Sequence, residues 1–204
     1  MEWMLVGLLL AVGVQAFNRK EQAERIALLG QHLRRYQVES LMGQLTEGYL
    51  RALDTPDPER QRQLWAALDN MELELNRQFA AFANDFAQVY SGQTQVSRLA
   101  VALPRAAQLF PKATFDAREM FAIHAKGIAT VVANEANRSH RDKAFMLTAE
   151  LYLMQHTCHW FCRSKNVASA RLLAQHKTSY RQVLGAVSAD TRRAYERLMD
   201  SDSI

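Results

Sequence analysis

Two histidines and two cysteines lie close together in the second half of the chain. His156, Cys158, His159 and Cys162 have the spacing His-x-Cys-His-x-x-Cys. Thiolate and imidazole groups together suit zinc or copper, and a thiol pair can also carry redox chemistry. These four residues are therefore the first candidates for a metal or redox site.

Their spacing argues against a single ion held by all four side chains. In a helix, the cysteines share a face with a stripe of apolar residues, whereas the histidines project to another face. Structural zinc sites usually draw their ligands from a Cys-x-x-Cys turn and a separate element. We therefore assign no metal ligand, and we expect both cysteines to be largely buried in the central helix of the domain. A metal or redox protein stays open as an alternative.

Catalytic motifs of several common enzyme classes are absent. The chain has no Glu-x-x-His, no His-Glu-x-x-His and no Cys-x-x-Cys-His, and it has no Gly-rich phosphate loop and no Gly-x-Ser-x-Gly. These motifs would have indicated di-iron, zinc, haem, nucleotide or serine hydrolase chemistry. The sequence gives no positive reason to propose an enzyme, and we expect no cofactor.

Basic residues gather in one interval of the chain. Between Glu150 and Asp190 there is no acidic residue, and the interval contains Arg163, Lys165, Arg171, Lys177 and Arg181. We interpret these five as a solvated basic face that can meet an anionic membrane surface or an acidic partner. The net charge is only +4 and no Lys/Arg-rich block is present, so we expect no specific nucleic-acid binding.

The composition predicts an all-α fold. The chain is 49% hydrophobic and contains only 8 Gly and 4 Pro, which suits long helices with few connections. We expect a compact domain of about five to seven helices. Two cysteines do not make a disulfide framework.

The first residues form an uncharged segment. Residues 3–17 lack any charged side chain, and as part of a helix over residues 1–17 they span ~25 Å. We expect a membrane-spanning anchor over residues 1–17; the residues that would define it are Trp3, Leu5, Leu8, Leu9, Leu10, Phe17, Arg19 and Lys20. A cleaved signal peptide and a buried core helix are the alternatives.

The remaining boundaries follow from apolar periodicity and caps. We expect an amphipathic membrane-proximal helix over residues 18–53, a helical domain over residues 54–199 and a frayed tail over residues 200–204. Asp57 and Thr114 are predicted N-caps, and Ser139 should start the segment that carries the His/Cys cluster. The apolar phase favours one helix from Ser139 to about Leu184, whereas the polar stretch 163–166 favours a break.

Together these patterns predict a membrane-anchored helical adaptor, scaffold or assembly protein. Positive residues flank the anchor on its C-terminal side, so the helical domain should lie on the cytoplasmic side of the membrane. Its expected partners are the membrane and either another protein or a second copy of the chain. The alternatives are the metal or redox protein and an exported helical domain released by cleavage.

Overall fold

The computed structural model describes residues 2–200, and it describes side chains from Val12 onward. This part of the chain is all-α, as predicted, and 79% of the residues are helical. It contains ten helices, of which eight have seven residues or more. Apart from α1, which was expected as a separate N-terminal helix, seven of these longer helices remain, in agreement with the expected five to seven. The helices are α1 (Glu2–Leu33), α2 (Val38–Asp54), α3 (Pro58–Phe86), α4 (Ser91–Thr94), α5 (Ala106–Leu109), α6 (Ala117–Ala133), α7 (His140–Cys162), α8 (Lys165–His176), α9 (Tyr180–Ala186) and α10 (Ala189–Asp200).

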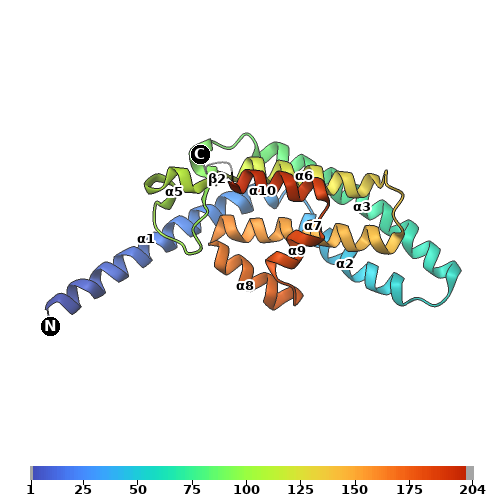
Figure 1. Ribbon diagram of the computed structural model, residues 1–204, viewed down its shortest axis with the longest axis horizontal. Coiled ribbons are helices and arrows are strands. Elements are labelled where there is room, and N and C mark those ends of the chain that lie inside the picture. Colours follow the sequence, from blue (N-terminus) through green and yellow to red (C-terminus); the bar gives the residue numbers. More distant parts are fainter. Residues whose placement is uncertain (1, 201–204) are drawn as a thin grey trace.

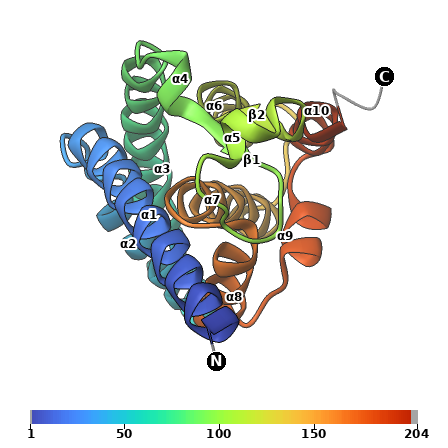
Figure 2. The same ribbon diagram turned by 90° about the vertical axis from the view of Figure 1, so that its left-hand side faces the viewer.

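Helix α7 lies at the centre of the molecule, as expected for the segment that begins at Ser139. It packs against α1, α2, α6, α8 and α9, which surround it when the molecule is viewed along its long axis (Figure 2). Ser139 is its N-cap, because the hydroxyl oxygen accepts the N–H of Asp142 at 3.1 Å. The central position of α7 places several of its polar side chains, among them Glu150, His156 and Thr157, inside the protein, where they must find partners.

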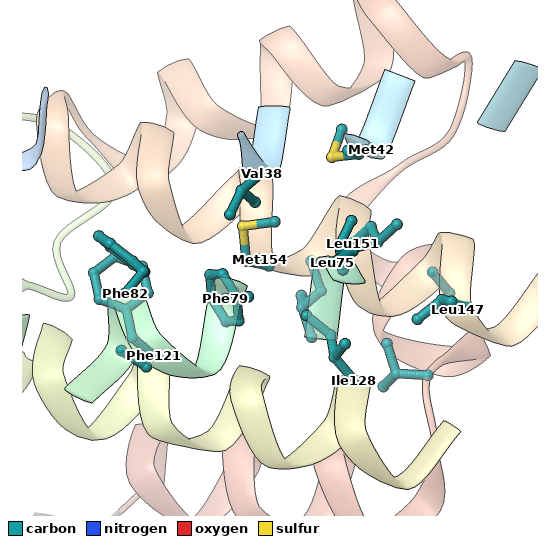
Figure 3. Close-up of a cluster of buried hydrophobic side chains, with 14 of the residues drawn as sticks. Val38, Met42, Leu75, Phe79, Phe82, Phe121, Ile128, Leu147, Leu151 and Met154 are labelled. Atoms are coloured by element: carbon teal, nitrogen blue, oxygen red, sulfur yellow. The ribbon is translucent and has the colours of Figure 1, made fainter. Parts of the chain in front are cut away.

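Buried hydrophobic side chains from α2, α3, α6 and α7 fill the core (Figure 3), and aromatic rings cluster in one part of it. The rings of Phe82 and Phe86 on α3 meet Phe121 on α6 edge-on, with centroids 5.2 and 5.1 Å apart. Phe86 also contacts Phe161 of α7 edge-on, at 5.7 Å. Edge-to-face contacts of this kind add to the stability gained from burying apolar area.

The single amphipathic helix expected over residues 18–53 is wrong, because two helices occupy this range. Helix α1 ends at Leu33, and α2 begins at Val38 after a short turn. The apolar pattern changes phase between Tyr36 and Val38, and the turn lets both residues face the core. Tyr36 contacts Phe82 edge-on at 6.2 Å, and Val38 is buried.

The single helix predicted from Ser139 to about Leu184 is also divided. Helix α7 ends at Cys162, since Arg163 has the non-helical angles φ −133° and ψ −95°. The Ser164 side chain then caps α8 by accepting the N–H of Val167. The continuous helix to about Leu184 is therefore wrong, and the polar stretch at 163–166 was the informative signal.

Two short strands lie between α4 and α6. Strand β1 (Gln95–Ser97) pairs antiparallel with β2 (Thr114–Asp116), and a 3-10 turn at Pro111–Ala113 leads into β2. Thr114 therefore belongs to a strand and is not the N-cap of the following helix. Asp116 takes that role for α6 by accepting the N–H of Arg118. The predicted cap at Asp57 is confirmed for α3.

The first half of α1 projects away from the helical body (Figure 1). Within the projecting part, Val12 and Phe17 are 57% and 61% exposed, so the alternative of a buried core helix does not fit these residues. In the part of the chain that was described, no helix combines the length and the apolar character needed to cross a membrane. The side chains of Trp3, Leu5, Leu8, Leu9 and Leu10 lie outside the described residues, as does the expected tail after Asp200.

The capped start of α7 gives a first test. Ser139→Ala removes the hydroxyl that accepts the N–H of Asp142, and should lower the free energy of unfolding by about 1 kcal/mol. Thr130→Ala is the matched control, because the Thr130 hydroxyl is exposed and bonds only back to Lys126 within α6. Urea denaturation measures both. Equal effects of the two substitutions would contradict the capping role.

Candidate functional site

The histidines and cysteines of α7 face different neighbours. His156 is buried, its Nε2 lies 3.1 Å from Ser169 Oγ of α8, and its ring stacks on Tyr180 at 4.7 Å. Cys158 lies on another side of α7, where its Sγ is 3.9 Å from Met154 Sδ. The four residues of the cluster therefore do not converge on one point. Among the residues with described side chains, no group of three or more potential ligands is arranged to hold a metal ion.

The thiols lie at the margin of the core. Cys158 and Cys162 pack against its buried residues and are partly exposed, with most of their surface covered, as the sequence predicts. Burial still raises the pKa of Cys158 far above its usual range and that of Cys162 to about 11. Both thiols are protonated at neutral pH and are therefore poor nucleophiles.

The five residues of the basic face follow one another along the α7–α8 connection, α8 and α9. Lys165 is partly buried, and its ammonium lies over the rings of Trp160 and Tyr180 at 5.0 and 5.1 Å. Arg171 donates toward His159 Nδ1 at 3.1 Å, and Lys177 donates to Ala174 O near the end of α8. The other two members, Arg163 and Arg181, are exposed. Part of this charge therefore stabilises the local fold.

A buried polar network lies where sequence analysis assigned no site. Glu150 of α7 has no exposed surface, and its Oε1 accepts the N–H of Ser188 at 3.0 Å. The Ser188 hydroxyl accepts the N–H of Thr191, 3.1 Å away, at the start of α10. Burial raises the pKa of Glu150, and the N–H of Ser188 and nearby hydroxyls act in the opposite direction. This network attaches α10 to α7.

A second buried pair lies about two helical turns from Glu150, on the same face of α7. His124 of α6 has no exposed surface, and its Nε2 is 2.8 Å from Thr157 Oγ1 of α7. Burial lowers the pKa of His124 to about 3 and that of His156 to about 4, so both rings are neutral at physiological pH. The only sequence signal for these contacts is the narrow polar strip of Glu150 and Thr157 on an otherwise apolar helix.

A third cluster links the opposite end of α7 to α2 and α3. Lys143 of α7 forms ion pairs with Glu72 at 2.5 Å and Asp69 at 2.9 Å. Tyr49 of α2 donates to the other oxygen of Glu72 at 2.7 Å. Glu72 is buried and fully paired, so it serves as a structural contact.

These three clusters have the chemistry of structural contacts. Glu150, His124 and Thr157 have no surface through which a substrate could reach them. Each of the three forms a hydrogen bond with a neighbouring element, as expected for buried polar groups, whereas Nδ1 of His124 has no hydrogen-bond partner among the described residues. The geometry therefore supports a rigid helical body and gives no positive support for catalysis. Comparison of the chain with known protein families, curated proteins and solved structures finds no match.

Gly127 tests the network around Glu150. A Cβ at this position of α6 would lie 2.6 Å from Glu150 Oε2 and closer still to Thr191 Oγ1. Gly127→Ala should therefore lower the free energy of unfolding by about 1–3 kcal/mol, because the buried carboxylate must move. Gly43→Ala is the control, since a Cβ there meets nothing within 4 Å and should stabilise α2 by about 0.5–1 kcal/mol. Thermal and urea unfolding distinguish the two, and a stabilising Gly127→Ala would contradict the close approach.

The buried histidines predict a pH dependence of stability. Their pKa values are depressed in the fold, so the unfolded chain binds protons first as the pH falls below about 6.5. Each histidine should then remove stability down to its folded pKa, by at most about 1.4 kcal/mol per pH unit. The double variant His124→Gln/His156→Gln lacks both buried imidazoles. Only wild type therefore loses stability through the protonation of these histidines in the unfolded chain. The difference in unfolding free energy between wild type and variant should shrink from pH 7 to pH 4. Urea denaturation across this range measures it, and a constant difference would refute the prediction. The raised pKa of Glu150 acts in the opposite direction but is common to both proteins.

Proposed function

We propose that the chain is a membrane-anchored helical adaptor. Residues 1–17 attach it to a bilayer, and the helical body stays on the cytoplasmic side, where it binds another protein. The observation that carries the proposal is the projecting first half of α1 (Figure 1), whose described apolar side chains are exposed. Exposed apolar surface of this kind marks contact with a membrane or with another protein.

The sequence of the projecting segment supports a lipid environment. Residues 3–17 carry no charge, and the exposed Arg19 and Lys20 follow directly, where they can reach lipid headgroups. Positive residues beside an apolar segment favour the cytoplasmic side of a membrane. The same charges support the proposed orientation of the body.

The attachment of α1 to the body supports an anchor that positions a folded domain. Arg25 of α1 donates to Phe161 O of α7 at 3.3 Å and to Gln95 O of β1 at 3.1 Å. Its guanidinium also lies 5.6 Å from the centre of the Phe161 ring. The helix that carries the apolar segment is thus fixed to the core.

An adaptor role fits the groups that the body offers to solvent. The buried polar clusters are structural contacts, and the thiols are held protonated by burial. The exposed charge along α8 and α9 includes Arg171 and Arg181, with no acidic residue between Glu150 and Asp190. An acidic surface on another protein complements this face.

Val12 provides the test of the anchor. Val12→Arg places a charge on an exposed position of the projecting helix, so the fold of the body should be unchanged. In a bilayer, the same charge costs about 2.5–3.5 kcal/mol. We expect wild type to remain with membranes after alkaline carbonate extraction, and Val12→Arg to move toward the soluble fraction. Leu53→Arg, at an exposed position near the end of α2, is the control and should stay with the membranes.

The outcomes separate the alternatives. If the intact wild-type protein is fully soluble, the proposal of a membrane anchor is contradicted. A mature chain that begins at Phe17 would indicate export after cleavage. The adaptor half is tested in the same detergent extract. Arg171→Glu/Arg181→Glu should release a co-purifying protein that wild type retains, and an unchanged set of proteins would contradict this assignment.

A further inference from the structure

The segment from Leu99 to Lys112, here called the α1-side loop, exposes apolar side chains beside the projecting helix. Leu109 and Phe110 are 66% and 48% exposed, and Val101 and Leu103 are 55% and 39% exposed. Four large apolar side chains within ten residues are more than the scattered single residues that a soluble surface carries without explanation.

The backbone of the α1-side loop is held by polar contacts that do not involve these side chains. Asn18 of α1 donates to Ala102 O at 3.1 Å, and Asn166 N at the start of α8 donates to Ala100 O at 3.1 Å. Glu21 of α1 accepts the N–H of Arg105 at 3.0 Å. The loop is thus fixed from α1 and α8, while its apolar side chains remain outside the core.

These contacts place the loop where α1 leaves the body. Figures 1 and 2 both show α5, which lies within the loop, on the side of the molecule from which the N-terminal half of α1 projects. A hollow of about 320 Å³ between α1 and the loop is lined by Phe17, Lys20 and Arg105. Exposed apolar residues of the loop and of α1 therefore share one end of the molecule.

Basic side chains lie near this apolar surface, and one of them, Lys20, is 4.0 Å from the exposed Glu24 carboxylate. Arg19 and Lys20 of α1 and Arg105 and Lys112 of the loop are all exposed. The nearby Glu21 carboxylate is paired with Arg25 at 2.9 Å, which offsets its charge. Exposed apolar and basic side chains on the same segments match the composition that binds an anionic lipid surface, where the basic groups meet the headgroups and the apolar groups meet the acyl chains.

We propose that the α1-side loop is a second membrane contact, in which Val101, Leu103, Leu109 and Phe110 enter the interfacial layer of an anionic leaflet. The inference rests on the proposed anchor, since α1 brings the loop to the bilayer. Two contacts on one rigid body fix its orientation, whereas the anchor alone leaves the body able to tilt. The exposed basic residues Arg105 and Lys112 belong to the same loop as the exposed apolar side chains. This combination favours an anionic lipid surface over a purely apolar protein partner.

A polarity-sensitive fluorophore on single cysteines tests the inference in the full chain. Cys158 and Cys162 are first replaced by Ala, and circular dichroism checks that the fold is kept. Cysteines are then introduced as Leu109→Cys in the loop, Phe17→Cys in α1 and Leu53→Cys at the opposite end of the body. Each labelled protein is reconstituted into vesicles of phosphatidylcholine, with and without phosphatidylglycerol, and lipids carrying a nitroxide quencher report contact with the bilayer.

We expect blue-shifted, quenched emission at positions 17 and 109 and none at position 53. The shift at position 109 should be larger with phosphatidylglycerol, and equal shifts in both lipids would overturn the role of the basic residues. A shift at 17 without one at 109 would overturn the second contact and leave the anchor intact. Loss of both would overturn the anchor as well. A shift at 109 that appears without vesicles and grows with protein concentration would show that a second copy covers the loop, and would also overturn the inference.

Discussion

Five other helices cover most of helix α7, and the polar side chains buried on this helix determine which contacts its neighbours must make. A carboxylate, a hydroxyl and an imidazole on one buried helix each require a partner, because an unpaired buried polar group costs about 1–3 kcal/mol. Glu150 obtains its partner from the start of α10, Thr157 from His124 of α6, and His156 from Ser169 of α8. The outer helices are therefore tied to the central one by polar contacts as well as by apolar area. Gly127 is part of the same arrangement, since only a hydrogen atom at that position leaves room for the Glu150 carboxylate.

Sequence reasoning found the features that depend on local chemistry. The all-α class followed from scarce Gly and Pro, and the caps at Asp57 and Ser139 followed from side chains that accept the N–H of a residue in the first helical turn. The breaks between helices at 34–37 and 163–164 were harder to predict, because neither contains Pro or Gly. The position of each break depends on how the following helix packs on the core. Strand β2 was missed because a three-residue strand exists only through its distant partner, β1.

The candidate site was predictable only in part. Stepping around a helix separated the cysteines from the histidines, and the structure places them against different neighbours. The network of Glu150, Ser188 and Thr191 could not be derived in the same way, because its members lie about forty residues apart and meet through tertiary packing. The remaining exposure of Cys158 has the same origin. A stripe of apolar residues shows which face turns inward, but how far a neighbour extends over that face depends on where α1 and α2 end.

Helix α1 runs without interruption from Glu2 to Leu33, and its second half is fixed to α7 and β1 through Arg25. An unbroken helix is stiff over this length, so no pivot separates the apolar segment from the body that it carries. A force that bends or twists the first turns of α1 therefore acts on the core through the whole length of the helix. Any tilt or rotation of the N-terminal segment therefore changes the orientation of the whole domain by the same angle.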